Sequence, residues 1–404
     1  MNPLKQAYCR IFQTCFRLAL PVLPYREPET FESITALEEL FHKLGHRRVL
    51  LVTDQFLRSS GATAPLEEYL TSRGFHLAVY DATRPNPTVD NVEQALALYR
   101  EQHCQCIIAF GGGSSMDCAK VVGARVAYPG KTVNQMGGIL RVLRKIPTLV
   151  AIPTTAGTGS EVTLAAVITD PATHHKYAIN SFPLIPRYAV LDPHATYTLP
   201  PHLTATTGMD ALTHAVEAFI GRSTTRHTRQ MALEATRLIF ANIETAYAQP
   251  EHYQARSNML QAAYLAGNAF SQSYVGYVHA VAHSLGGRYN IPHGLANSVL
   301  LPYVLEAYGA AAHKKLHRLA VAAGVASESD SPARAAELFI AAIRELNRRM
   351  GIPTKLQGIC PEDIPAMARY ADREANPLYP VPVLMDAKEL EQFYFNVMDG
   401  SETQ

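Results

Sequence analysis

Five side chains in the second half of the sequence could bind a divalent metal ion. Asp210 and His214 are four residues apart in TTGMDALTH, so they project from one face of a predicted helix. His279 and His283 have the same spacing in HAVAHSLGG, and His293 follows after a turn. Imidazole and carboxylate groups are common protein ligands of tetrahedral metal sites. Because four ligands complete such a site, one histidine is left over, and the spacing does not say which.

Simpler explanations exist for each part of this pattern. On its own, the pair Asp210 and His214 is better explained as an ordinary side-chain pair. Three histidines in an otherwise apolar, glycine-rich stretch are harder to explain as solvated surface. His313 and His317 share the helical spacing, but two lysines lie between them, which indicates a solvated basic face. Ala280 stands where the HExxH motif of zinc proteases requires glutamate, which excludes that class.

A glycine-rich loop earlier in the chain could bind phosphate groups. The apolar strand predicted at Cys106–Phe110 is followed directly by GGGSS, which contains Gly112, Gly113 and Ser114. Glycines let the backbone approach a ligand closely, and the N-terminus of the following helix offers free amides to a pyrophosphate. The loop departs from the GxGxxG fingerprint, so on this motif alone a tight turn is an equally good interpretation.

A second loop, PTTAGTGSEVT at Pro153–Thr163, strengthens the case for a dinucleotide. It follows the strand predicted at Thr148–Ile152 and holds two glycines and five hydroxyls, among them Thr154, Thr155 and Thr163. Hydroxyls and exposed amides suit phosphate, ribose and amide groups. Open α/β sheets bind ligands at the carboxyl ends of their strands, and both loops follow such ends.

Two more polar side chains follow predicted strands in the same way. Asp54 closes the first strand (LLVTD), where its carboxylate could accept both ribose hydroxyls. It would repel a 2′-phosphate, so NAD is favoured over NADP. Asn86 follows the second strand in RPNPT and could touch the cofactor, although an Asn-Pro turn is the simpler interpretation.

The elements that carry these loops alternate in residues 27–205. Short apolar strands are separated by helical segments such as 64–73 and 89–102, which predicts a doubly wound parallel sheet. The predicted strands are 49–53, 76–80, 106–110, 148–152 and 188–191. This half of the chain is therefore an expected α/β dinucleotide-binding domain.

From Thr206 onward the strand signals stop. Alanine- and leucine-rich helices follow, the first predicted as an N-capped helix from Thr206 to just before Gly221. We therefore predict an all-helical metal-binding domain at 206–404, and a ligand site in the cleft between the two domains.

Residues 1–26 form a separate amphipathic extension in this prediction. Apolar residues recur at helical spacing, with Lys5, Arg10 and Arg17 between them. A basic amphipathic helix can rest on a membrane surface, but packing on its own protein or on a partner subunit is the preferred interpretation. The apolar run Leu18–Leu23 is short and lacks the features of a secretory signal.

Composition excludes several classes of protein. The 36 Lys and Arg residues balance 35 Asp and Glu, and no basic stripe is present, so no nucleic-acid partner is expected. No apolar run approaches the ~20 residues of a membrane span. Six sparse cysteines do not indicate a disulfide scaffold and suit reduced thiols in a cytoplasmic protein.

Four motifs together resemble those of the iron-containing (group III) alcohol dehydrogenases. They are GGGSSMDCAK, PTTAGTGSEVT, GMDALTH and HAVAHSLGGRYNIPHG, in matching order and spacing. The resemblance runs from residue 27 to the C-terminus and includes Asn376-Pro377. It implies an architecture shared with dehydroquinate synthase, and NAD(P)-dependent interconversion of small alcohols with aldehydes or ketones. It also implies a divalent metal, usually Fe²⁺, and a homodimer or larger homo-oligomer.

The resemblance assigns roles to single residues. The family's metal ligands, an aspartate and three histidines, match Asp210, His214, His279 and His293. His283 matches a family histidine close to the nicotinamide and the substrate, which makes it the expected catalytic residue. The cofactor positions that carry over are Asp54, Asn86, Gly112, Gly113, Ser114, Thr154, Thr155, Thr163 and Lys176. Lys176 rests on the resemblance alone.

Other functions remain open at this point. A hydroxyacid–oxoacid transhydrogenase with tightly held NAD belongs to the same superfamily. A lyase of the dehydroquinate synthase type would carry glutamate in place of Asp210, and a non-catalytic protein is disfavoured by the complete set of candidate ligands. The donor set accepts Zn²⁺ as well as Fe²⁺. Phe270, Tyr274 and Tyr277 are the candidate lining of a pocket whose preferred alcohol the sequence does not identify.

Overall fold

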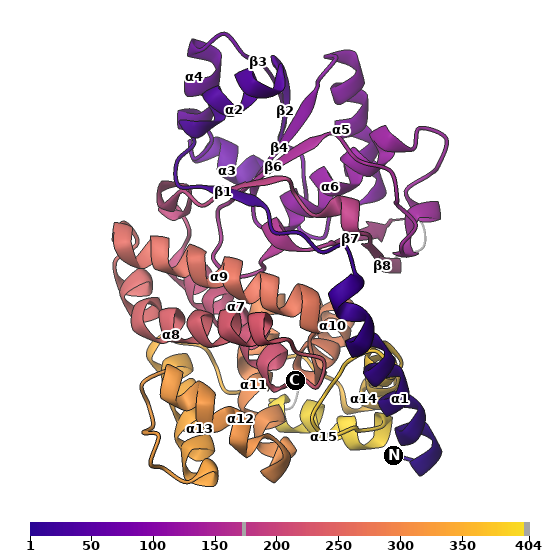
Figure 1. Cartoon of the computed structure of the whole chain (residues 1–404), viewed down its shortest axis with the longest axis vertical. Coiled ribbons are helices and arrows are strands. Elements are labelled where there is room, and N and C mark those ends of the chain that lie inside the picture. The colour runs from indigo at the N-terminus through magenta and orange to yellow at the C-terminus, as the bar shows by residue number, and fades with distance from the viewer. Residues whose placement is uncertain (172–174, 400–404) are drawn as a thin grey trace. The chain divides into compact units, whose positions relative to one another are not determined.

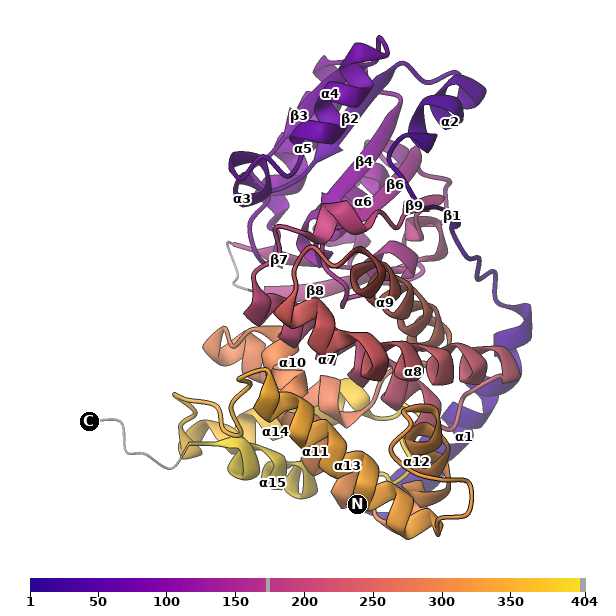
Figure 2. The ribbon, with the colours of Figure 1, turned by 90° about the vertical axis from the view of Figure 1, so that its left-hand side faces the viewer.

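The computed structural model describes residues 1–171 and 175–399, and the chain divides into two compact units. The first, here called the sheet unit, is Pro24–Leu199 with Pro250–Leu260. The second, the helical unit, is Met1–Leu23, Pro200–Gln249 and Gln261–Gln404. Figures 1 and 2 show the elements of each unit in two views.

The sheet unit is built on a six-stranded sheet in which all neighbouring strands are parallel. The strand order is β1-β9-β6-β4-β2-β3. The strands are β1 (Glu29–Phe31), β2 (Arg48–Val52), β3 (His76–Tyr80), β4 (Cys106–Gly111), β6 (Thr148–Pro153) and β9 (Tyr188–Val190). The predicted doubly wound sheet is therefore confirmed. The sequence pattern does not predict β1, because this strand is only three residues long and largely exposed.

Buried side chains on both faces explain why the strands are continuous apolar runs. Along β2, Leu50 and Val52 belong to one hydrophobic cluster, whereas Val49 and Leu51 belong to another. The first cluster includes residues of α5 (Val89–Glu101) and α6 (Gly113–Ala127), and the second includes residues of α2 (Ala36–Leu44) and α4 (Ala64–Ser72). Helices on both faces leave no polar side to the central strands, which favours Val, Ile and Leu at consecutive positions.

The chain leaves the centre of the sheet in opposite directions after β2 and β4. From β2 it continues to β3 at one edge, and from β4 it continues to β6 on the other side. The loops after β2 and β4 therefore flank a topological switch point, where open α/β sheets bind ligands. Asp54 and the glycine-rich loop lie in these two loops.

A small second sheet combines one strand that precedes β6 in the chain with two strands that lie between β6 and β9. It consists of β5 (Gly138–Ile139), β7 (Ala165–Asp170) and β8 (His175–Asn180), with β7 and β8 antiparallel. The sequence pattern does not predict these strands. β5 has only two residues, and β7 and β8 interrupt their apolar residues with polar ones such as Asp170, Lys176 and Asn180.

The helical unit carries the predicted metal ligands. Its helices are α1 (Pro3–Ala19), α7 (Pro201–Ile220), α8 (Arg226–Ala248), α10 (Tyr277–Tyr289), α11 (His293–Tyr308), α12 (Ala310–Ala322), α13 (Pro332–Arg349), α14 (Ile364–Ala375), α15 (Ala387–Val397) and the greater part of α9 (Tyr253–Ser273). The fold class of an α/β half followed by a helical half is confirmed. No helix in the described part of the chain has both the length and the apolar character needed to cross a bilayer.

The predicted start of α7 at Thr206 is wrong. The helix begins at Pro201, because proline has no amide hydrogen to lose at the first helical position and its fixed φ suits a helix. The hydroxyls of Thr206 and Thr207 donate to the carbonyl groups of His202 and Leu203, four residues earlier. Threonine is thus satisfied inside the helix, so its presence does not mark the helix start.

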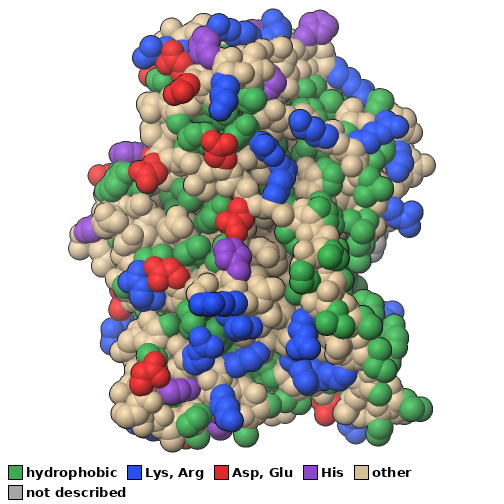
Figure 3. All heavy atoms as spheres, viewed as in Figure 1, with side chains coloured by type: hydrophobic (Ala, Val, Ile, Leu, Met, Phe, Trp, Pro, Cys, Tyr) green, Lys and Arg blue, Asp and Glu red, His purple; other side chains and the backbone are tan. Residues whose placement is uncertain are grey.

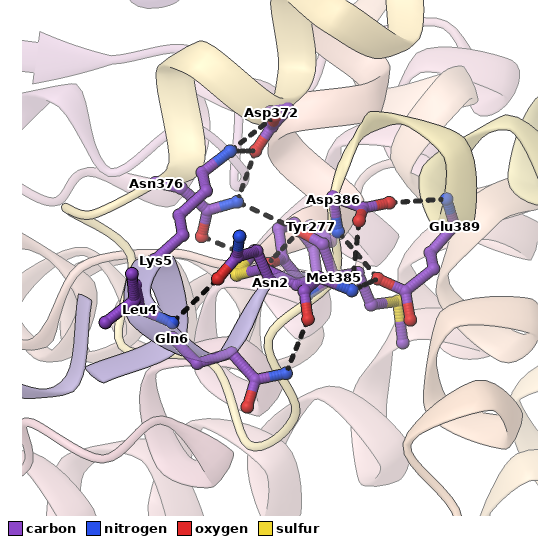
Figure 4. Close-up of polar contacts among 11 residues, drawn as sticks. Asn2, Leu4, Lys5, Gln6, Tyr277, Asp372, Asn376, Met385, Asp386 and Glu389 are labelled. Carbon is purple, nitrogen blue, oxygen red and sulfur yellow. Dashed lines mark hydrogen bonds and ion pairs between the residues drawn. The ribbon is translucent and has the colours of Figure 1, made fainter. Parts of the chain in front are cut away.

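Helix α1 packs on its own chain. Lys5 Nζ lies 2.7 Å from the Asp372 carboxylate, and Figure 4 shows this contact. The Arg10 guanidinium donates to the carbonyl oxygens of Val381 and Pro382 at 2.8 and 2.9 Å. The buried Gln13 amide donates to the Tyr379 carbonyl at 2.8 Å. Polar side chains therefore hold the N-terminal helix against the C-terminal part of the helical unit.

The backbone at Gly111 generates a prediction for the loop after β4. Gly111 has φ of 153°, and a Cβ atom there would lie 2.5 Å from Ser115 Oγ. Gly111→Ala should therefore lower the free energy of unfolding by about 1–3 kcal/mol. Gly112 has an ordinary φ, and a Cβ atom there would lie 3.5 Å from Thr155. Gly112→Ala is the matched control, which should unfold in urea almost as the parent does; equal losses in both variants would contradict this explanation.

Candidate functional site

Four of the five candidate metal ligands come together in the helical unit. Asp210 and His214 project from α7, His279 from α10 and His293 from the first turn of α11. One ligand atom from each of them lies within 4.8 Å of the others. His293 Nε2 is 3.5 Å from the Asp210 carboxylate, and the His279 ring stacks on the His214 ring at 4.5 Å. Three helices therefore bring one carboxylate and three imidazoles to a common point.

The chemistry of this group fits a divalent cation. Burial, followed by the charges of the neighbouring histidines, holds the pKa of His279 well below its usual value. The imidazole is thus neutral near pH 7, which is the form that binds a metal. Three imidazole nitrogens and one carboxylate make a complete tetrahedral set. Such a set accepts Fe²⁺ or Zn²⁺.

His283 is the candidate that lies outside this four-residue group. Its Nδ1 lies 2.6 Å from Glu374 Oε1, and its ring stacks on His293 at 5.2 Å. Glu374 also accepts a hydrogen bond of 2.7 Å from the Tyr379 hydroxyl. The side chain of His283 is 41% exposed, unlike the buried His279 one turn earlier. The carboxylate of Glu374 therefore directs His283 away from the position of a fifth ligand.

Glu217 contacts the ligand group, and the motif analysis does not find it. Its buried carboxylate accepts hydrogen bonds from the amides of Gly276 and Val278, each at 2.8 Å, and lies 2.6 Å from His279 Nδ1. Burial raises the pKa of Glu217 to about 7, while the hydrogen bonds lower it. A carboxylate on Nδ1 fixes the ring and leaves Nε2 for the metal. Position 217 follows Asp210 by seven residues, which places both on one face of α7 and is the signal that could have found it.

Asn297 is a second contact that the sequence analysis misses. It is fully buried on α11, four residues after His293. Its Nδ2 donates to Asp210 Oδ1 at 2.6 Å and lies about 3 Å from ring nitrogens of His279 and His293. The amide thus holds the Asp210 carboxylate toward the imidazoles. The i, i+4 spacing from His293 is again the available signal.

The three aromatic candidates for a substrate pocket have different surroundings. Phe270 stacks on His214 with 4.1 Å between ring centroids, beside the ligand group. Tyr274 contacts Phe16 of α1 at 4.9 Å. Tyr277 is fully buried, and its hydroxyl is hydrogen-bonded to both the amide and the carbonyl of Met385. The expectation that Tyr277 lines a pocket is therefore wrong, because its side chain belongs to the core.

The two glycine-containing loops of the sheet unit lie against each other. The Thr154 amide donates to the Gly111 carbonyl at 3.1 Å, which joins the ends of β4 and β6. Gly112 caps α6, and Gly113 and Ser114 begin that helix. Because the first amides of a helix have no partner within it, this end offers donors to an anion. Thr155 borders the same space, since a Cβ atom on Gly112 would lie 3.5 Å from it.

Asp54, Asn86 and Lys176 are the remaining cofactor candidates with partly exposed or exposed side chains. Asp54 caps α3 (Gln55–Ser59), where one carboxylate oxygen accepts the Leu57 amide at 2.9 Å. Lys176 Nζ donates to Asn86 Oδ1 at 2.8 Å. The structure therefore brings together two residues that are ninety positions apart in the chain and that sequence analysis proposes on separate grounds.

Thr163 has an internal partner that the sequence does not reveal. Its hydroxyl accepts a 2.9 Å hydrogen bond from the buried Lys120 Nζ, which also donates to Ser160 Oγ and the Ala165 carbonyl. Burial lowers the pKa of Lys120 to about 8, while Asp117 raises it. Lys120 thus links α6 to the loop Pro153–Thr163 by hydrogen bonds. Thr163 therefore has a structural role whether or not it contacts a ligand.

The Glu217 contacts lead to a prediction about metal affinity. Glu217→Gln keeps the side-chain volume but presents an NH₂ group to at least one of three donors. We expect affinity for Zn²⁺ to fall roughly 10- to 100-fold, because the His279 ring is no longer held in one orientation. Equilibrium dialysis of the apoprotein against Zn²⁺ measures this change.

The control for that experiment is Glu345→Gln. Glu345 is a surface carboxylate that pairs with Arg348 and Arg349 on α13. Surface ion pairs contribute little to stability, so this variant should bind Zn²⁺ as the parent does. A Glu217→Gln protein with unchanged Zn²⁺ affinity would contradict the positioning role.

Two protein-family models match the chain. The C-terminal model of the Fe-containing alcohol dehydrogenase family matches residues 204–398, and the iron-containing alcohol dehydrogenase model matches residues 30–193. The 1,3-propanediol dehydrogenase of Klebsiella pneumoniae is 41% identical over 348 residues, which cover 85% of this chain and 90% of that protein. The NAD-dependent methanol dehydrogenase of Bacillus methanolicus is 36% identical over 81% of this chain and 87% of that protein.

A solved structure agrees with these matches. A 1,3-propanediol oxidoreductase is 38% identical and superposes with a TM-score of 0.88 over 93% of this chain and 99% of that chain. Both halves of the sequence and the fold thus point to the same relatives. The chain belongs to the iron-containing alcohol dehydrogenase family.

Proposed function

We propose that this protein is an NAD-dependent alcohol dehydrogenase that interconverts a small alcohol with its aldehyde or ketone, with Fe²⁺ as the first candidate metal and Zn²⁺ as the second. The observation that carries the proposal is the convergence of Asp210, His214, His279 and His293. A divalent cation held there supplies Lewis-acid polarisation of the substrate oxygen. Relatives named for 1,3-propanediol and methanol support a small alcohol as the substrate.

The residues of the helical unit have distinct tasks in this proposal. Glu217 keeps the Nδ1 side of His279 occupied, so Nε2 is directed to the ligand position. Glu374 does the same for His283, whose side chain is 41% exposed and can therefore exchange a proton with the substrate or solvent. His283 is therefore the proposed proton carrier, a role that histidine side chains often have in catalysis.

The residues of the sheet unit bind the dinucleotide in this proposal. The amides of Gly112, Gly113 and Ser114 at the start of α6 receive the pyrophosphate. The Asp54 carboxylate accepts the ribose hydroxyls with the oxygen that does not cap α3, and repels a 2′-phosphate. The relative named as an NAD-dependent dehydrogenase supports NAD over NADP. Thr154, Thr155, Thr163, Asn86 and Lys176 complete the proposed cofactor site.

The experiment that tests the function measures NADH production from a panel of alcohols. The apoprotein is reconstituted anaerobically with Fe²⁺ or with Zn²⁺ and given ethanol, 1,2- and 1,3-propanediol, butanol and a 2-hydroxy acid. We expect turnover that depends on the added metal. A protein that binds one metal per chain and NAD, but forms no NADH from any alcohol, would contradict the proposal.

His279→Ala should remove metal binding and turnover together. Loss of one of four ligands leaves the cation with an incomplete set, so we expect activity to fall at least about 100-fold. His313→Ala is the control, because His313 belongs to the surface pair with the same helical spacing. Metal content and NADH formation are measured on both variants, and full activity of a metal-free His279→Ala protein would rule out the assigned site.

Asp54→Gly should relax the choice between the two dinucleotides. Glycine is a tolerated N-cap residue, so α3 loses only a few tenths of a kcal/mol. Without the carboxylate, the ratio of kcat/KM for NAD to that for NADP should fall at least tenfold, by about 1.4 kcal/mol or more. An unchanged ratio would mean that Asp54 does not contact the ribose.

A further inference from the structure

Helix α1 turns its apolar side away from the protein. Leu4, Tyr8, Ile11, Leu18 and Val22, here called the apolar stripe, are between 58% and 81% exposed. Their spacing of three, four or seven residues places them along one side of the helix and its short extension. The opposite side carries the buried Cys9 and Gln13. A surface helix normally buries its apolar side, so this arrangement leaves a contiguous hydrophobic surface to be covered.

Cations from three elements gather beside the stripe. Arg17 of α1, Arg222 after α7 and Lys315 of α12 line one cavity of about 420 Å³. No carboxylate among the described residues forms an ion pair with any of these three. Lys315 Nζ donates to the carbonyls of Ile220 and Gly221, and burial followed by the charges of Arg229 and Arg222 lowers its pKa to about 8. The uncompensated charge therefore favours an anionic ligand.

The surface view shows hydrophobic and basic side chains next to each other in this part of the molecule. In Figure 3, hydrophobic side chains follow the right-hand edge of the lower half, where Figure 1 places α1. Lys and Arg side chains gather on the neighbouring front of that half, with few acidic ones between them. The two features meet at Arg17, which lines the cationic cavity and directly precedes Leu18 of the stripe.

We propose that the apolar stripe and the cations Arg17, Arg222 and Lys315 dock this protein onto the surface of an anionic lipid bilayer. The stripe enters the interface between headgroups and acyl chains, and the cations face the phosphates. The helix lies along the surface, because its 17 residues are not apolar enough to span a bilayer.

The charge of α1 makes it unfavourable for a second copy of the chain to pack on the apolar stripe. The helix contains Lys5, Arg10 and Arg17 and no acidic residue. If two copies of α1 packed together, like charges would meet at the edges of their contact. Stable helix pairs carry opposite charges at those positions. A lipid headgroup supplies the missing negative charge.

The helix is already held in position for this contact. The ammonium group of Met1 lies 2.9 Å from Asp386 and 3.0 Å from Glu389, and Lys5 pairs with Asp372 (Figure 4). Arg10 and Gln13 add hydrogen bonds to backbone carbonyls. Docking therefore does not have to order the helix, which removes an entropic cost of binding.

The test is co-sedimentation of the full-length protein with lipid vesicles. We expect binding to vesicles of phosphatidylcholine mixed with phosphatidylglycerol, weaker binding to phosphatidylcholine alone, and release by salt.

Ile11→Asp combined with Leu18→Asp should lower the affinity for mixed vesicles at least about tenfold. Leu143→Asp is the control, because Leu143 is 68% exposed but belongs neither to the apolar stripe nor to the cationic cavity. Arg17→Glu with Arg222→Glu should lower affinity for mixed vesicles about fivefold or more per residue, with little effect on neutral vesicles.

Several outcomes would overturn the proposal. They are absence of binding to mixed vesicles, equal and salt-independent binding to both kinds of vesicle, and an equal loss for Leu143→Asp. Sedimentation velocity without lipid tests whether a second copy of the chain covers the stripe instead. That alternative holds if the parent is an oligomer, the Ile11→Asp, Leu18→Asp variant is not, and the variant still binds vesicles as the parent does. All substituted residues are exposed or line an open cavity, and thermal unfolding of each variant verifies that it folds.

Discussion

The buried carboxylate of Glu217 joins two helices that must keep a fixed position for the ligand group to exist. It accepts the amides of Gly276 and Val278 at the start of α10, and it contacts the ring of His279 in the same turn. The first amides of a helix have no partner inside it, so a buried helix start needs acceptors from elsewhere. Glu217 supplies them from α7, the helix that also carries Asp210 and His214. This contact also requires glycine at position 276, because a Cβ atom there would lie 2.6 Å from Glu217 Oε1.

A buried charge has a comparable task in the sheet unit. Lys120 Nζ donates to Ser160, Thr163 and the Ala165 carbonyl, and Asp117 accepts Ser160 and the Val167 amide. Removing either charge would leave buried donors or acceptors without partners, which is costly in a dry interior. In both units, then, the side chains expected to meet ligands are held by buried ionisable groups that are themselves satisfied by hydrogen bonds.

The sequence predicts much of this from local spacing and misses what depends on distant partners. Burial on both faces selects uninterrupted apolar runs, so local sequence predicts the five strands. Helical spacing is regular, so it also singles out the histidines. Which histidine lies outside the ligand group depends on the contact of His283 with Glu374, ninety-one positions away. Local spacing does not reveal that contact. Glu217 and Asn297 do lie on the ligand faces of α7 and α11, but a polar residue on such a face is usually structural. The start of α7 was misplaced because threonine can cap a helix or be satisfied within it.

Helix α1 shows a different limit of pattern analysis, since periodicity reveals two faces but not which one is buried. Here the inner face is held by Lys5, Arg10 and Gln13, whose partners are a carboxylate and backbone carbonyls of the C-terminal segment. Burying a large apolar side chain contributes about 1.5–3 kcal/mol, and the residues of the apolar stripe forgo most of that in the isolated chain. An orientation that satisfies polar groups internally and leaves apolar ones outside is unfavourable for a helix whose only task is to complete the fold. It becomes favourable at an anionic bilayer. The apolar stripe then gains the free energy of transfer from water, and Arg17 and Arg222 face the negatively charged headgroups.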